Sequence, residues 1–352
     1  MAYLNRTIVF SNSILKSSFR FEDKFQVLPL NMEGKPQNQC ARHFPIFLEF
    51  SIDDDEIDRY ERLKYSTALF NRQKEIINLL SCLTNHRFFS YDTSMNGWGI
   101  GVPNKPIDKI TEEEFDILNK QESCWYISGY LYRGLKEDMI INRFSDYSPK
   151  AILKEARMHE YYINNPIDDY QHEICFPNTL PTALHFYYGL SENIRRKVNS
   201  SIYLACDGMD ISVHKRSLSF LSYISAIEGL IDLDVNDDEI VFECGSCKTI
   251  KSSPYKCPIC GRPIWGIKQK FVNFLSKYVS RTEKSQKKYK KIYDLRSSIT
   301  HKGQLFLGDY DMSFNEERRE NDENDWLMRL ETLQLFRIAL DSWLRDPEKK
   351  KH

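Results

Sequence analysis

The stretch Tyr293–Gly303 (YDLRSSITHKG) carries an arginine and a histidine five residues apart, near the end of an expected helix. Gly303 stands where a helix commonly stops, and apolar residues recur before it at helical spacing, namely Ile292, Leu295 and Ile299. At ~100° per residue, those residues form a stripe that packs on the core, and Arg296 and His301 project from the opposite side. Such side chains near a helix end suit catalysis or recognition, and a solvated helix face is the alternative interpretation.

A second stretch, Phe220–Leu230 (FLSYISAIEGL), also has the spacing of a buried helix. Glu228 is the only charged residue between Ser217 and Ile231. A carboxylate in an apolar run needs a partner if it is buried. We expect Glu228 to orient Arg296 or Lys302, and the alternative is that it tips into solvent at the edge of the stripe.

The two stretches resemble two helices of HEPN domains, especially those of the Apea-like branch. Tyr293–Gly303 is similar to the R-x4-6-H signature helix, and Phe220–Leu230 is similar to the earlier helix that carries a glutamate. The resemblance covers roughly residues 184–345. It differs in one detail, because Apea-like members often end the motif in His-Gly and this chain has Lys302 between the two.

The resemblance implies metal-independent RNA cleavage, in which the ribose 2′-hydroxyl attacks the adjacent phosphate and leaves 2′,3′-cyclic phosphate and 5′-hydroxyl ends. Histidine suits the proton transfers because imidazole titrates at about pH 6.5 in model peptides. The planar fork of arginine suits phosphate oxygens. Ser297 lies where many HEPN motifs have a polar residue, although a surface serine is equally compatible. The residues predicted for catalysis are Arg296, His301, Ser297 and Glu228.

One histidine cannot comfortably act as acid and base at once. Members of the family resolve this by dimerising, with two signature helices facing each other across a two-fold axis. The resemblance therefore implies a homodimer in which two arginines and two histidines form one composite active site.

A basic run, Gln286–Lys291, leads into the signature helix. Lysines there would attract phosphate, and Tyr289 or Tyr293 could stack a base. A lysine-rich helix face is usually just solvated, which is the alternative. The lysines predicted to bind RNA are Lys287, Lys288, Lys290, Lys291 and Lys302.

Two C-x2-C knuckles separated by nine residues are the strongest local signal in the sequence. Four thiolates at this spacing can converge on one tetrahedral Zn²⁺, and an iron centre of the rubredoxin type is the rival. Four cysteine ligands leave no open position for water, so we expect one structural zinc ion per chain. The ribbon would span residues 240–265, either as a clip or also as a carrier of lysines toward nucleic acid. The predicted ligands are Cys244, Cys247, Cys257 and Cys260.

Length and composition predict two domains in a chain of ordinary globular type. The chain has 352 residues, 41% of them hydrophobic and 28% charged, and a net charge of −1, so bulk charge does not indicate nucleic acid. We find no signal peptide at the N-terminus and no apolar run of about 18 residues, which excludes a membrane span. The cysteines are then expected to be reduced thiols in a cytoplasm.

The pattern along the chain predicts an α+β fold. Residues 1–180 are expected to form a mixed domain with strands at Tyr3–Phe10, Phe44–Ile52 and Cys124–Tyr132 and a helix over 60–84. This domain would sense a trigger or restrain the nuclease. Residues 181–350 are expected to form an all-α HEPN bundle into which the zinc ribbon is inserted.

These observations combine into one functional hypothesis. The chain is expected to be a cytoplasmic HEPN endoribonuclease that acts on RNA as a toxin or an antiviral, anti-phage defence effector. A phage or antitoxin protein would be its partner, and no membrane is involved. Two alternatives stay open: a non-catalytic RNA-binding or adaptor protein, and a protein-interaction scaffold.

Overall fold

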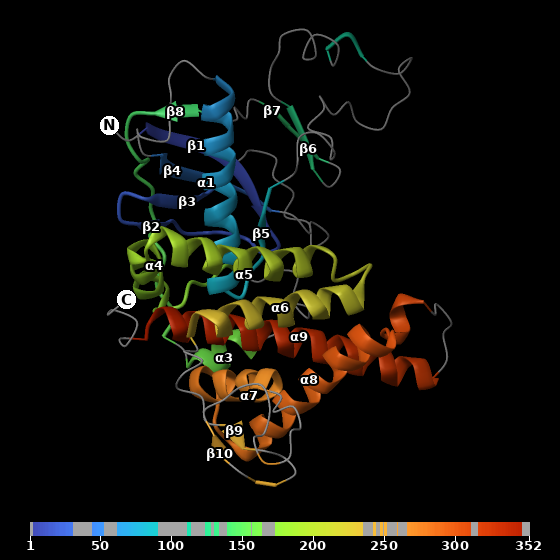
Figure 1. Ribbon diagram of the computed structural model, residues 1–352. Coiled ribbons are helices and arrows are strands. Elements are labelled where there is room, and N and C mark those ends of the chain that lie inside the picture. The colour runs from blue at the N-terminus through green and yellow to red at the C-terminus, as the bar shows by residue number, and fades with distance from the viewer. Residues whose placement is uncertain are drawn as a thin grey trace. The chain divides into compact units, whose positions relative to one another are not determined.

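An antiparallel sheet and a set of α-helices make up the structure, a computed structural model, so the chain has a mixed α+β fold (Figure 1). Its contacts separate two units. Unit 1 comprises Met1–Ala156 and Asn164–Pro181, and unit 2 comprises Arg157–Ile163 and Thr182–His352. The residues described are 3–30, 44–52, 62–90, 111–113, 124–127, 130–133, 139–155, 157–163, 173–234, 242–243, 247–248, 250–251, 259, 266–310 and 316–346.

The sheet of unit 1 has the strand order β2-β3-β4-β1-β5, and β8 pairs with the first part of β1. Aromatic and β-branched residues dominate these strands, as expected for a pleated surface that is buried. The long pair β1–β4 is in register from Tyr3 opposite Ile52 to Ser11 opposite Phe44. The strands are β1 Tyr3–Ser11, β2 Phe19–Phe21, β3 Phe25–Pro29, β4 Phe44–Ile52, β5 Phe88–Phe89 and β8 Met139–Ile141.

Two of the predicted strands and the predicted helix of unit 1 are present. The strands are β1 and β4, and the helix is α1, Arg62–Leu83, which packs on β4 and β5. The prediction of a single strand over Cys124–Tyr132 was wrong. That region forms a hairpin of β6, Cys124–Ile127, and β7, Tyr130–Arg133. The two strands pair antiparallel, from Cys124 opposite Arg133 to Ile127 opposite Tyr130.

A buried carboxylate ties the strands of unit 1 together. Glu49 on β4 is fully buried and accepts hydrogen bonds from the Arg6 guanidinium on β1 and the Gln26 amide on β3. The hydroxyl and the backbone N–H of Ser145 donate two more. Burial alone would raise the pKa of Glu49, but these hydrogen bonds outweigh it and hold the pKa below its usual value.

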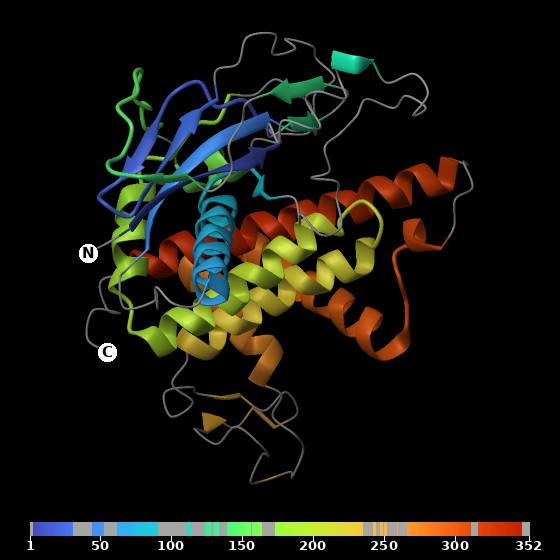
Figure 2. The same ribbon diagram turned by 90° about the horizontal axis from the view of Figure 1, so that it is seen from above.

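Unit 2 is helical, as the sequence predicts from residue 181 onward. Helix α6 packs between α5 and α9, and α7 packs on α6, α8 and α9 (Figures 1 and 2). The short helix α3, Met158–Ile163, packs on α9 and so belongs to unit 2. The longer helices are α4 Leu180–Gly189, α5 Glu192–Asp210, α6 Arg216–Asp234, α7 Gly266–Tyr278, α8 Glu283–Lys302 and α9 Glu316–Leu344.

The core of unit 2 contains most of the apolar stripes seen in the sequence. On α6, which was predicted to be a buried helix, the apolar residues at helical spacing are all buried, because this helix has neighbours on several sides. On α8, Ile292 and Ile299 are buried and Leu295 is half-buried. The α6 stripe consists of Phe220, Ile224, Ile227 and Ile231. Within the described ranges, no helix has the length and apolar character needed to cross a membrane.

Candidate active site

Helix α8 is defined by a cap at each end. At its start, the Thr282 side chain accepts a hydrogen bond from the backbone N–H of Ser285, at 3.2 Å. At its end, Gly303 adopts the left-handed conformation, with φ of 66°, and its N–H bonds the carbonyl of Ser298. The predicted stop at Gly303 is therefore confirmed. His301 lies in the last turn, where the helix dipole favours a positive charge.

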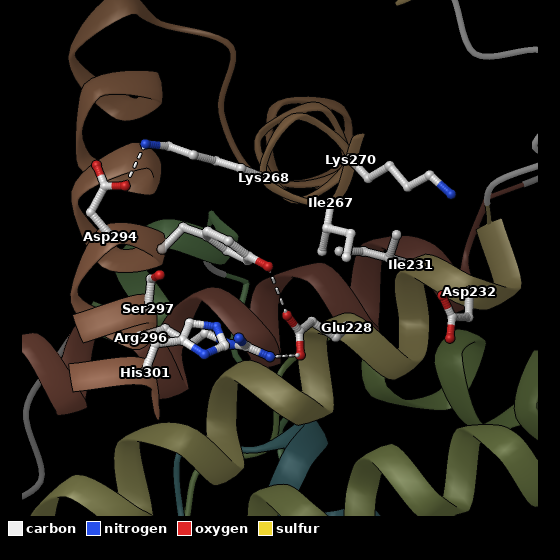
Figure 3. A pocket seen from close by; sticks show the side chains of 11 residues that line it. Glu228, Ile231, Asp232, Ile267, Lys268, Lys270, Asp294, Arg296, Ser297 and His301 are labelled. Atoms are coloured by element: carbon white, nitrogen blue, oxygen red, sulfur yellow. Dashed lines mark hydrogen bonds and ion pairs between the residues drawn. The ribbon is translucent and has the colours of Figure 1, made fainter. Parts of the chain in front are cut away.

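Helices α6, α7 and α8 enclose a pocket of about 630 Å³. All the side chains predicted for catalysis line it, one from α6 and the others from α8 (Figure 3). Because α6 and α8 are far apart in the sequence, only the packing of unit 2 brings these groups together. The lining residues are Glu228, Ile231, Asp232, Ile267, Lys268, Lys270, Tyr293, Asp294, Arg296, Ser297 and His301.

Glu228 and Arg296, which the sequence suggested as partners, form an ion pair across the pocket. The Glu228 Oε2 atom lies 3.5 Å from an Arg296 terminal nitrogen, and the Tyr293 hydroxyl donates to Oε1 at 3.4 Å (Figure 3). The Arg296 guanidinium also lies 5.7 Å from the centre of the Tyr293 ring. The Arg296 and Glu228 side chains are 26% and 25% exposed, so a ligand entering the pocket can reach both.

The expected direction of Arg296 was wrong. Helical angles alone place it opposite the apolar stripe and away from its own core, whereas its guanidinium turns toward α6 and Glu228. A long flexible side chain follows the nearest opposite charge, which a projection along one helix axis does not include. His301, in contrast, is exposed at the end of α8.

Tyr293 supplies a hydrogen-bond donor to the pocket. Its ring packs against Phe271 of α7, with ring centroids 5.3 Å apart. Burial, and then the negative charge of Glu228, raises the pKa of the Tyr293 phenol, although Arg296 opposes this. The phenol therefore stays protonated near neutral pH and donates to Glu228. Tyr289, the other tyrosine considered for base stacking, is 1% exposed and donates to the Ser280 carbonyl, so it cannot stack.

The lysines that line the pocket are on α7 and were not among the predicted RNA-binding residues. Lys268 pairs with Asp294 of α8 at 2.5 Å, and Lys270 lies toward the other end of the pocket (Figure 3). Ile267 has the helical spacing of a core residue relative to the buried Phe271, Phe274 and Tyr278, yet it is 51% exposed because the first turn of α7 borders the pocket. Only the packing of α7 on α8 shows that Lys268, Lys270 and Ile267 line the pocket.

The predicted RNA-binding lysines lie elsewhere on α8. Lys287 pairs with Glu283 in the preceding turn, and Lys288 pairs with Glu331 of α9, both at 2.7 Å. The remaining three, Lys290, Lys291 and Lys302, are exposed. None of the five lines the pocket between α6, α7 and α8.

Of the four predicted zinc ligands, only Cys247 is among the described residues, and it is exposed. Cys244, Cys257 and Cys260 lie outside them. Among the residues that the structure describes, no three His, Cys, Asp or Glu side chains form a metal-binding group. The strands β9, Phe242–Glu243, and β10, Ile250–Lys251, pair antiparallel around the first knuckle, and Lys248 has a φ of 59°.

No protein-family model, curated protein or solved structure matches this chain. The HEPN assignment therefore stays a resemblance of two sequence stretches, and function is inferred from the pocket.

Proposed function

We propose that unit 2 is a metal-independent endoribonuclease of the HEPN type, which cleaves RNA by attack of the 2′-hydroxyl on the neighbouring phosphate. The products would be 2′,3′-cyclic phosphate and 5′-hydroxyl ends. One observation carries the proposal: a single pocket is lined by a guanidinium, an imidazole, a hydroxyl and a carboxylate. This set provides a phosphate anchor and groups able to move protons.

Arg296 would hold the scissile phosphate. Its contact with Glu228 involves one terminal nitrogen, and a guanidinium has five N–H donors in a planar fork. In a half-buried site, such a guanidinium stabilises the negative charge that develops on the phosphorane. Ser297, beside it on α8, would donate a hydrogen bond to a phosphate oxygen, and His301 would transfer a proton.

We further propose that the four cysteines hold one structural Zn²⁺ per chain. The β9–β10 pair brackets Cys244 and Cys247, as the first knuckle of a ribbon requires. Lys248, directly after Cys247, has the left-handed backbone that favours glycine, and the second knuckle has Gly261 at the matching position. With four thiolate ligands the metal would stabilise the fold and take no part in catalysis.

The biological setting proposed rests on the resemblance alone. A cytoplasmic toxin or anti-phage effector would cut RNA of the host or phage, and a phage or antitoxin protein would control it. The same resemblance implies a homodimer, which sedimentation at micromolar concentration would measure.

Cleavage of single-stranded RNA in the presence of EDTA tests the function. We expect the wild-type chain to produce cyclic-phosphate ends, detected by mass spectrometry, and His301→Ala to lower the rate by about 10²–10⁴-fold. His214→Ala is the matched control, because His214 is exposed in the turn between α5 and α6. Unchanged cleavage by His301→Ala would refute the assignment. Binding of RNA without new ends would indicate an adaptor instead.

A further inference from the structure

Cleavage by 2′-hydroxyl attack needs two proton-transfer groups. One must accept the proton of the attacking hydroxyl, and another must donate a proton to the departing 5′-oxygen. His301 provides one such group in each chain. The pocket contains a second ionisable group on the facing helix, the Glu228 carboxylate, which is in contact with the proposed phosphate anchor.

We propose that Glu228 is the general base and His301 the general acid of the same chain, so that each chain holds a complete active site. This inference rests on the proposed RNA cleavage and adds the identity of the base. It differs from a composite site in which a second chain must contribute its histidine.

The contacts of Glu228 leave its carboxylate available to a substrate. Its distances to Arg296 and Tyr293 are 3.5 Å and 3.4 Å. Charge-assisted hydrogen bonds are normally about 2.7–2.9 Å long from a guanidinium and about 2.5–2.7 Å long from a hydroxyl, so both contacts are weak. With a quarter of the side chain exposed, a ribose hydroxyl can compete for either carboxylate oxygen.

Arg296 places that hydroxyl near the carboxylate. A phosphate bound to the guanidinium would occupy the fork now turned toward Glu228, and the ribose 2′-hydroxyl is attached next to that phosphate. Phosphate binding would also draw the guanidinium away from Glu228, which frees a carboxylate oxygen for the ribose hydroxyl. The resting ion pair thus keeps base and anchor side by side until RNA enters.

The proposed step balances in atoms and charge. Glu228 takes the proton of the 2′-hydroxyl, the O2′–P bond forms, and the P–O5′ bond breaks. The imidazolium of His301 gives its proton to the leaving 5′-oxygen. Water then returns a proton to His301 and removes one from Glu228.

The other charged groups of the pocket are less suited to the role of base. Asp294 is tied to Lys268 at 2.5 Å, and the Tyr293 phenol remains protonated. Figure 3 shows Asp232 at the Lys270 end of the pocket, away from His301. Glu228, in contrast, lies 3.5 Å from the phosphate anchor, Arg296.

The pH dependence of the cleavage rate separates a base from a merely structural carboxylate. A carboxylate base and an imidazolium acid give a bell-shaped profile. We expect Glu228→Gln to lower the rate by about 10²–10⁴-fold and to remove the acidic limb while the alkaline limb remains. Glu228→Asp should restore the acidic limb. Glu192→Gln, which breaks an exposed pair with Arg196 on α5, should leave the profile unchanged.

A mixed assembly tests whether one chain is sufficient. Glu228→Gln and His301→Asn chains with different tags would be co-expressed, and any complex carrying both tags would be purified. We expect no recovery of cleavage, since neither chain then holds both groups. A cleavage rate of the mixed complex above that of either variant alone would show that base and acid come from different chains. That result would overturn the proposal.

Two further outcomes would also overturn it. Glu228→Gln could retain the wild-type rate, or it could lose rate with an unchanged pH profile, which assigns Glu228 a structural role. Both outcomes leave RNA cleavage itself intact. Failure of the wild-type chain to form cyclic-phosphate ends would instead reject the proposed function, so the two failures are distinguishable.

Discussion

Asp309 accepts a hydrogen bond from the backbone N–H of Ser217, at 2.8 Å, and so caps the start of α6 from a segment that follows α8. Its other carboxylate oxygen accepts from the N–H of Arg216 at 2.6 Å. The Ser217 hydroxyl in turn accepts from the N–H of Phe306. The short 3-10 helix Leu307–Asp309 is thereby fixed to the helix that carries Glu228.

Removing this cap should destabilise unit 2. We expect Asp309→Ala to lower the free energy of unfolding by about 1–2 kcal/mol, because two backbone donors at the α6 N-terminus lose their acceptor. Asp309→Asn should lose less, since one amide oxygen remains. Urea unfolding followed by circular dichroism measures both. Asp207→Ala on the exposed side of α5 is the control, and an equal loss there would show that the cap contributes little.

The planar guanidinium of Arg296, which can bind two phosphate oxygens at once, leads to a further prediction. Arg296→Lys keeps a positive charge but cannot bind two phosphate oxygens at once, so we expect the cleavage rate to fall by roughly 10²-fold or more. Arg196→Lys, on the exposed face of α5, is the matched control. Single-turnover rates measure the effect. A lysine variant of Arg296 with wild-type activity would mean that charge alone suffices.

The two lysine sets make opposite predictions for RNA affinity. Lys268 and Lys270 line the pocket, whereas Lys290 and Lys291 are exposed on α8 outside it. We expect replacement of the first pair by alanine to weaken RNA binding more and to reduce the salt slope by about 0.7 per lost phosphate contact. Fluorescence anisotropy at several salt concentrations measures this. A larger change in the Lys290/Lys291 double variant would place RNA along α8, as the sequence suggested.

Local signals in the sequence predicted the end of α8 well. The spacing of Ile292 and Ile299 and the glycine at 303 depend on neighbouring residues only, so they predicted the last turns of α8 and its end. The isolated charge of Glu228 in an apolar run also indicated a partner correctly. These features are set by short-range helix chemistry and by the cost of burying a charge.

Contacts between distant helices could not be predicted in the same way. Ile267 has the spacing of a core residue, yet the packing of α7 leaves it at the pocket edge. The inward turn of Arg296 required the position of α6, and the Lys268–Asp294 pair required the crossing of α7 and α8. Periodicity assigns a residue to a face of its own helix but does not say which helix lies opposite.

Zinc content tests the ribbon. We expect about one zinc ion per chain by elemental analysis, and Cys257→Ser should lower it and loosen residues 240–265, because metal binding contributes directly to folding of such a site. Cys175→Ser, at an exposed cysteine of unit 1, is the control. Limited proteolysis after chelation of the metal measures how easily residues 240–265 are cleaved. Iron in place of zinc would select the rubredoxin alternative, and no bound metal would refute the ribbon.

The buried Glu49 predicts how unit 1 responds to acid. Its pKa is lowered in the folded state, so its contribution to stability is present above the unfolded value, about 4.3, and is lost as pH falls through the folded value. Glu49→Gln should cost on the order of 3 kcal/mol at pH 7, because it leaves the Arg6 charge without its partner. The difference from wild type should shrink as the pH falls below 4.

Hydrogen exchange of β1 and β4 peptides in increasing urea, at pH 7 and in acid, measures this contribution within unit 1. Glu173→Gln is the control, since Glu173 pairs with Lys16 at the surface and its loss should change stability by less than about 1 kcal/mol. A Glu49→Gln deficit that is the same at both pH values would show that Glu49 acts through packing. A deficit that disappears in acid would show that its stabilising effect comes from the ionised carboxylate, which accepts hydrogen bonds from Arg6, Gln26 and Ser145.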